Sequence, residues 1–149
     1  MSAPTGDDRS TGDSARADVE LRLPADGAYA SVLRTTTAAL AARLDFTIDD
    51  IEDLRIAVGE ASALVLPEAD PDADVTARFH LGAGTMTVEV STRAIDDPQP
   101  DYESFAWQVL DTLASDAFVE AAQGIFRVTF TMTSQLVAGA TDKPAGAEL

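Results

Sequence analysis

The chain contains no cysteine and only one histidine, His80. The absence of cysteine excludes disulfides, thiolate metal sites and a cysteine nucleophile. A single histidine excludes a histidine-rich metal site within one chain. It also counts against a Ser-His-Asp triad, because the other members of the triad would have to converge on His80.

Positive charge is also scarce. Ten Lys and Arg residues stand against 26 Asp and Glu residues, which gives a formal net charge of −16. So acidic a protein repels a phosphate backbone, and we expect no direct contact with nucleic acid. A basic protein partner is more plausible, because the field of an acidic chain speeds such an encounter. The alternative is an acidic face that serves solubility alone.

Long apolar runs are absent as well. No run approaches the roughly 20 residues that cross a bilayer, and the first residues, MSAPTGDDRS, lack the basic and apolar regions of a signal peptide. We therefore expect a soluble, cytoplasmic protein with no membrane contact. Polar and small residues dominate the two ends of the chain. They predict a disordered tail over residues 1–17, one domain over 18–136 and a second disordered tail over 137–149.

Hydrophobic periodicity predicts three helices and five strands. The expected helices span residues 26–43, 48–66 and 105–116, and the expected strands span 19–23, 75–81, 86–90, 118–120 and 126–132. Because the strands come in pairs, the order favours a two-layer α/β sandwich. An antiparallel or mixed sheet would then be covered on one face by three helices.

Each expected helix has a candidate N-cap. Asp26 precedes the first helix and Ser104 precedes the third, while Thr47 and Asp49 are alternatives for the second. Side-chain oxygens at these positions can accept a hydrogen bond from a free backbone N–H of the first turn.

The helix over residues 48–66 carries a glutamate in an unusual place. Ile56, Glu60 and Leu64 fall on one line of the helix, inside an apolar arc. A carboxylate placed in that arc loses hydration, which is typical of groups that transfer protons or contact ligands. The alternative is that Glu60 lies at the edge of the arc and reaches solvent.

This helix also carries a resemblance. The segment Asp53-Leu54-Arg55-Ile56-Ala57-Val58-Gly59-Glu60-Ala61 resembles the D-L-x-L-A-V-x-E-A core of anti-sigma factor serine kinases of the RsbW type, including their diverged actinobacterial forms. With the expected order of elements, the resemblance covers most of residues 18–134 and implies the GHKL ATPase fold. It places Glu60 at the position of the catalytic base, which activates a serine hydroxyl of an antagonist protein for attack on ATP.

Three departures concern the nucleotide. Leu64 stands where the ATP-using family has the asparagine that binds magnesium, and leucine has no oxygen for that ion. Asp96 and Asp97 are candidates for the contact with adenine, but no glycine lies between Gly84 and Gly124. The family has an Asp-x-Gly-x-Gly motif at the first of its glycine-rich loops and a second glycine-rich loop that opens the next helix and cradles phosphates. Residues 101–104 stand in place of the second loop, and their acidic side chains would repel a triphosphate.

We therefore predict an anti-sigma-factor-like regulator that binds a sigma factor, its antagonist or both, with no cofactor. An active ATP- and magnesium-dependent serine kinase is the alternative, and a scaffold of the same fold is a third reading. The resemblance also implies a homodimer. Phe105 and Trp107 share a helical arc with core positions and are expected in the core rather than at an interface, whereas Tyr102 is expected to be exposed.

Overall fold

One antiparallel sheet runs through the part of the chain that the computed structural model describes, residues 16–96 and 98–137. Its strand order is β1-β2-β3-β5-β4, and every neighbouring pair is antiparallel. The strands are β1 (Val19–Pro24), β2 (Asp74–Gly82), β3 (Thr85–Arg93), β4 (Asp116–Ala122) and β5 (Ile125–Thr133). Antiparallel order follows from the short hairpin turns that join β2 to β3 and β4 to β5.

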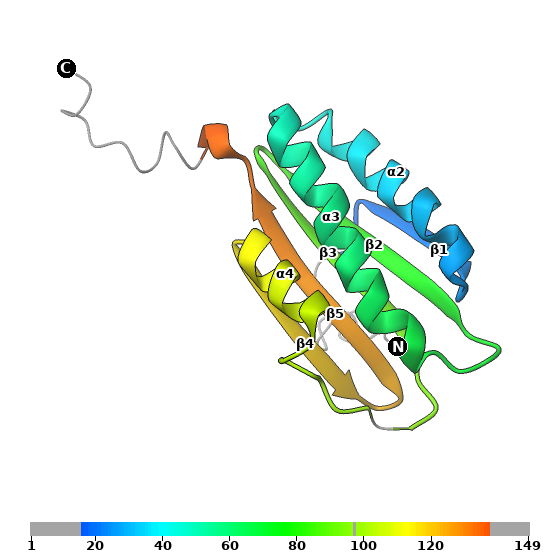
Figure 1. Cartoon of the computed structure of the whole chain (residues 1–149). Helices are drawn as coiled ribbons and strands as arrows, with labels where there is room; N and C mark the ends of the chain where they lie inside the picture. Colours follow the sequence, from blue (N-terminus) through cyan, green and yellow to red (C-terminus); the bar gives the residue numbers. More distant parts are fainter. Residues whose placement is uncertain (1–15, 97, 138–149) are drawn as a thin grey trace, which may run out of the picture.

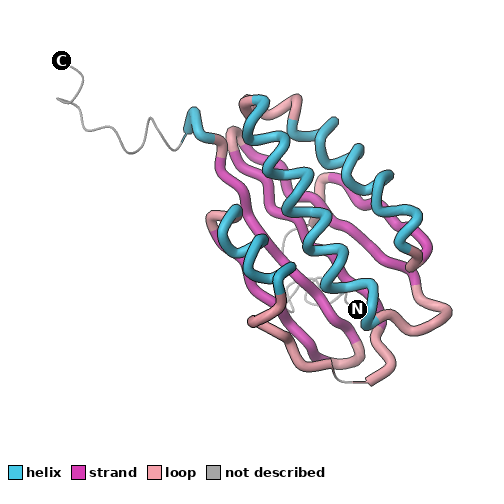
Figure 2. The backbone as a smooth tube through the Cα atoms, viewed as in Figure 1, coloured by secondary structure: helices cyan, strands magenta, loops and turns pink. Residues whose placement is uncertain are grey.

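Three α-helices cover one face of this sheet (Figures 1 and 2). They are α2 (Ala30–Ala41), α3 (Ile48–Val65) and α4 (Phe105–Leu113), and short 3-10 turns, η1 (Gly27–Tyr29) and η2 (Leu66–Glu68), precede α2 and follow α3. In Figure 1, α3 lies in the middle of the helical layer, with α2 toward β1 and α4 toward β4. The predicted two-layer sandwich with three helices on one face is confirmed.

The core lies between the two layers. Alternate side chains of β2, β3 and β5 point toward the helices, and Phe79, Val88 and Phe130 are fully buried there. The helices contribute Leu54 of α3 and Leu110 of α4, which are also fully buried. The strict alternation of apolar and polar residues thus reports which face of the sheet is covered.

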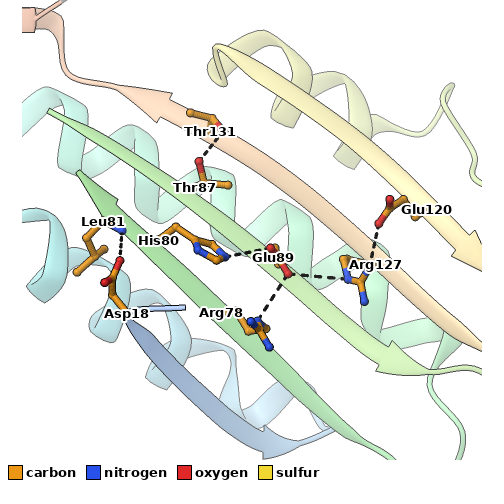
Figure 3. A network of polar contacts seen from close by, with 9 residues as sticks. All are labelled: Asp18, Arg78, His80, Leu81, Thr87, Glu89, Glu120, Arg127 and Thr131. Carbon is orange, nitrogen blue, oxygen red and sulfur yellow. Dashed lines mark hydrogen bonds and ion pairs between the residues drawn. The ribbon is translucent and has the colours of Figure 1, made fainter. Parts of the chain in front are cut away.

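The other face of the sheet is polar, and its centre is Glu89 of β3 (Figure 3). The carboxylate of Glu89 lies 3.0 Å from Nε2 of His80 and within 4.0 Å of Nε of both Arg78 and Arg127. Arg127 also donates a 2.9 Å hydrogen bond to Glu120 on β4. These cross-strand contacts pair several charges of this face within the sheet itself, although Nε of Arg78 is buried without a hydrogen-bond partner.

Several element boundaries differ from those predicted. The first helix begins as a 3-10 turn, because Tyr29 has φ −93° and ψ 2° and interrupts the α-helical backbone. The third helix ends at Leu113 instead of continuing to residue 116, since Ala114 is extended. The neighbouring Ser115 N–H donates to the carbonyl of Thr131, and β4 begins at Asp116, two residues before the strand predicted at 118–120.

No helix in the described part of the chain is long and apolar enough to cross a membrane. Almost all of the two predicted tails, residues 1–15 and 138–149, lies outside the described residues.

Candidate functional site

The helix α3 begins with a reciprocal cap. The hydroxyl of Thr47 accepts a 3.0 Å hydrogen bond from Asp50 N–H, and the Asp50 carboxylate accepts a 3.1 Å hydrogen bond from Thr47 N–H. This capping box decides between the two candidate caps in favour of Thr47. The cap fixes the start of the helix that carries Glu60.

Glu60 lies at the edge of the buried face of α3. Its neighbours Ala57 and Ala61 are fully buried, whereas Ile56, one turn before Glu60, is 46% exposed. The side chain of Glu60 itself is half-buried and makes no hydrogen bond or ion pair with any other described residue. Glu60 therefore lies at the edge of the buried arc, as the alternative expected. The expectation that Ile56 belongs to that arc is wrong, because the arc is centred on Leu54, Ala61 and Val65.

Residues 69 and 70, which follow α3, are hydrogen-bonded to residues 93 and 94, where the loop with the candidate adenine-binding residues begins. Ala69 forms an isolated antiparallel bridge with Ala94, and Asp70 N–H donates a 2.9 Å hydrogen bond to the carbonyl of Arg93. Asp70 also pairs with the Arg93 side chain at 3.3 Å. The loop therefore starts beside the C-terminal end of α3.

Of the two candidates for adenine contact, Asp96 is described and Asp97 lies outside the described residues. Asp96 is exposed and makes no hydrogen bond or ion pair with another described residue. The structure thus gives Asp96 no polar link to Glu60.

Residues 101–104, just before α4, form a closed hydrogen-bonded turn. Oδ1 of Asp101 accepts a 3.0 Å hydrogen bond from Glu103 N–H, and the carbonyl of Asp101 accepts one from Ser104 N–H at 3.3 Å. Oγ of Ser104 then accepts a 3.2 Å hydrogen bond from Trp107 N–H and caps the helix. Three backbone N–H groups at this position are therefore already bonded within the chain.

Leu64 serves packing. It is partly buried and contacts the hydrophobic core from the C-terminal half of α3. Its side chain offers no oxygen, so the position that the resemblance assigns to a magnesium ligand contributes apolar contact instead.

The aromatic residues around α4 are distributed differently from the prediction. Phe105 is 76% exposed, so its assignment to the core is wrong. The buried side of α4 is centred on Leu110, about 140° from Phe105 on a helical wheel. Trp107 packs against the core as predicted, and its ring meets the exposed ring of Tyr102 edge-on, with 5.2 Å between the centroids.

Two carboxylates in the first turns of α3 have shifted pKa values. Partial burial raises the pKa of Asp53 above 3.8, and the nearby carboxylates of Asp50, Asp49 and Glu52 raise it further. Burial would also raise the pKa of Asp50, but hydrogen bonds from the backbone of Gln135 and from Thr47 outweigh it and lower that pKa below 3.8.

Sequence reasoning missed the structural role of Asp50. The spacing Thr47-x-x-Asp50 is a capping-box signature, so the bond to Thr47 could have been predicted. The 3.0 Å hydrogen bond from Gln135 N–H joins residues far apart in the chain, and no local pattern announces it.

No protein-family model matches the chain. Among curated proteins, it is similar to serine-protein kinase RsbW of Bacillus velezensis, with 28% identity over 139 residues, covering 79% of this chain and 85% of the relative. It is 38% identical over 76 residues to serine-protein kinase RsbW of Bacillus subtilis, which covers 49% of this chain and 48% of the relative. The match therefore spans most of the first relative and about half of the second.

Two solved structures resemble the fold. The RsbU and RsbW domains of a Mycobacterium tuberculosis protein match with a TM-score of 0.57 and 20% identity, over 77% of this chain and 32% of that chain. The histidine kinase domain of a blue-light activated kinase from Erythrobacter litoralis matches with a TM-score of 0.50 and 14% identity, over 80% of this chain and 65% of that chain. The predicted GHKL-like architecture is thereby confirmed at the level of the fold.

Proposed function

We propose that this chain, which is similar to serine-protein kinases of the RsbW type, regulates transcription by binding proteins in a partner-switching circuit. It would act as an anti-sigma-factor-like protein whose nucleotide site is degenerate. Its partners would be a sigma factor, the antagonist of an anti-sigma factor, or both. The family likeness supports the circuit, and the residues of the candidate site support the loss of ATP use.

The observation that carries the loss of ATP use is the closed turn before α4. A phosphate-binding loop offers free backbone N–H groups to the phosphate oxygens. Here the N–H groups of Glu103, Ser104 and Trp107 donate to oxygens of Asp101 and Ser104. The exposed carboxylates of Asp101 and Glu103 add negative charge at the same place, which disfavours a triphosphate.

The residues on α3 do not fit a magnesium ion either. Magnesium demands oxygen ligands in near-octahedral geometry, and Leu64 packs against the core at the position where the resemblance expects such an oxygen.

An active serine kinase is the second candidate, and two observations favour it. The relatives from Bacillus are named serine-protein kinases. Glu60 is half-buried, without a polar partner among the described residues, at the position that the resemblance assigns to the base. Under this alternative, Glu60 would accept the proton of the attacking serine hydroxyl.

Isothermal titration with ATP and magnesium separates the two candidates, with ADP as a control. We expect no saturable heat at millimolar ATP. Saturable binding at micromolar ATP, weakened when Asp96 is replaced by Asn, would instead favour the kinase, with adenine read by that carboxylate.

Partner binding needs its own test. The full chain is purified together with each sigma factor and each antagonist candidate encoded in the source genome, and complexes are measured by size-exclusion chromatography. We expect one of these proteins to form a stable complex in the absence of ATP. If none does, the proposed circuit is wrong, whatever the outcome of the titration.

The proposal includes a homodimer. Sedimentation velocity of the full chain across a concentration series measures this directly. A monomer at every concentration would contradict the homodimer. The proposed binding of protein partners would still stand.

A further inference from the structure

The outer face of α4 is apolar and partly exposed, although α4 is one of the three helices that cover the sheet. Phe105 is 76% exposed, and the partly buried Val109 and Leu113 follow it at four-residue intervals, with Leu113 also in contact with the core. Together with Gln108 and Thr112, these side chains line a shallow groove of about 290 Å³. Figure 1 shows α4 at the edge of the helical layer, with α3 on its inner side.

The shape of this groove fits a helix. Phe105, Val109 and Leu113 form one ridge of residues spaced by four, and Gln108 and Thr112 belong to the next ridge. Grooves between such ridges accept the ridges of a neighbouring helix, which is how helices pack in layered proteins. A helix seated here would extend the layer of α2, α3 and α4 by one member.

The charge around the groove has one sign. Between Arg93 and Arg127 the chain carries seven acidic residues and no basic residue. Asp101, Glu103, Asp111 and Asp116 are all exposed, and none of them forms an ion pair with a described residue. Glu120, in contrast, is paired with Arg127 on the open face of the sheet.

The other edge of the helical layer is mixed in charge, because the exposed Asp26 and Asp45 flank its arginines and Asp26 lines a small pocket there. The segment from Gly27 to Leu44, which contains α2, has two arginines, Arg34 and Arg43, and no acidic residue. Exposed apolar side chains occur there as well, for example Val32 at 42%. At the α4 edge, an apolar groove lies beside exposed acidic residues that form no ion pair with a described residue, which selects for a basic occupant.

We propose that the groove on α4, around Phe105, Val109 and Leu113, binds a basic amphipathic helix of a partner protein. Apolar side chains of that helix fill the groove beside Phe105, and its Lys or Arg side chains meet the acidic rim. This is the helix-in-groove mode of recognition. Any partner with a basic amphipathic helix could bind in this way, whether or not it is a sigma factor.

The test uses synthetic peptides of about 18 residues, long enough for several helical turns. One fluorescent peptide of Leu, Ala, Lys and Arg has leucines spaced for one apolar face. A second has the same composition in an order that destroys that face, and a third replaces Lys and Arg by Glu. Binding to the full-length protein is measured by fluorescence anisotropy at low and at high salt. We expect binding by the first peptide alone, weakened by salt.

Matched variants locate the binding surface. Phe105→Ser should weaken binding of the first peptide by about tenfold or more, because exposed aromatic anchors carry much of the energy of such contacts. Ile48→Ser removes an equally exposed side chain, 79% exposed at the start of α3, and should change binding by less than about twofold. Asp111→Lys should weaken binding, whereas Glu20→Lys on the exposed face of β1 should change it less. Thermal unfolding confirms that each variant is folded.

Three outcomes would overturn the proposal. The first is equal binding by the ordered and the shuffled peptide, which would mean that charge alone attracts them. The second is equal affinity for the protein with Phe105→Ser and with Ile48→Ser. The third is self-association of the full chain that Phe105→Ser abolishes, because a second copy would then fill the groove.

Discussion

The carboxylate of Asp50 accepts a 3.0 Å hydrogen bond from the backbone N–H of Gln135, which lies 85 residues later in the chain. The same oxygen accepts the bond from Thr47 N–H that completes the cap of α3. One buried side chain therefore joins the start of the central helix to the segment that follows β5. Ser134 strengthens this junction, since its hydroxyl donates to the carbonyl of Asp45 at 2.9 Å.

Replacing Asp50 by Ala should lower the free energy of unfolding by about 1–3 kcal/mol, because the variant leaves two part-buried N–H groups without an acceptor. Urea denaturation measures the change. The control is Asp49→Ala, which removes an exposed carboxylate from the same helical turn and should cost only a few tenths of a kcal/mol. Equal effects of the two variants would show that the bond to Gln135 contributes nothing.

The hydrogen bond between Asp50 and Gln135 should also make the free energy of unfolding depend on pH. The pKa of Asp50 lies below 3.8 in the folded protein, so the carboxylate stabilises the fold above the unfolded pKa, and this contribution is lost as pH falls through the folded pKa. The difference in unfolding free energy between the native chain and Asp50→Asn should therefore shrink as pH falls below 3.8. Urea denaturation over an acid series tests this, and a constant difference would contradict it.

Asp53 should behave in the opposite way. Its raised pKa means that the charged form is disfavoured by folding at neutral pH. Asp53→Asn should raise the free energy of unfolding by a few tenths of a kcal/mol at neutral pH, since the site is partly solvated. The gain should shrink as pH falls through the raised pKa and disappear below 3.8, where the carboxyl is protonated in both the folded and the unfolded state. Glu52→Gln, at an exposed neighbour, is the control in the same denaturation series.

We expect a side chain at Gly84, in the turn between β2 and β3, to destabilise the fold strongly. Its φ is +74°, and a Cβ there would collide with the side chain of Val137. Gly84→Ala should therefore cost about 2–4 kcal/mol, with backbone strain and overpacking combined. Gly124 has φ +78° and open space around it, so Gly124→Ala should cost only about 1–2 kcal/mol of backbone strain. The difference between the thermal unfolding curves of the two variants measures the cost of the collision with Val137. Identical curves would show that this collision costs nothing.

Local patterns explain why most of the fold could be predicted. The alternation in β2, β3 and β5 records directly which side chains face the helices, because one face of the sheet is covered and the other is not. Ser104 was identified as a cap from residue type alone, and it caps α4 as expected. Such features depend on a few neighbouring residues, which the sequence displays.

The errors have a common physical cause. The sequence shows where Phe105 and Glu60 lie on their helices relative to apolar neighbours. It does not show how wide the buried face of each helix is. Contacts between α3, α4 and the sheet determine that width, and they bury Leu110 and Ala61 while leaving Phe105 outside. Likewise, the closed turn at residues 101–104 depends on which backbone groups Asp101 and Ser104 reach. The residue types predicted the loss of a glycine loop but not the structure that replaces it.

Leu64→Asn tests the account of the nucleotide site most directly. It restores the residue type that the ATP-using relatives are expected to have, while the turn before α4 keeps three of its N–H groups, those of Glu103, Ser104 and Trp107, bonded within the chain. We expect no magnesium-dependent turnover of ATP, measured as release of phosphate, and no saturable heat on titration with ATP.

The same substitution should lower the free energy of unfolding by about 1–2 kcal/mol, because an amide replaces apolar contacts of a partly buried leucine. Ala63→Asn, at an exposed neighbour on α3, is the control and should cost less. If Leu64→Asn produced robust magnesium-dependent turnover, a single oxygen would suffice to complete the site. The turn at residues 101–104 would then have to open for the triphosphate, and Glu60 would return as the candidate base.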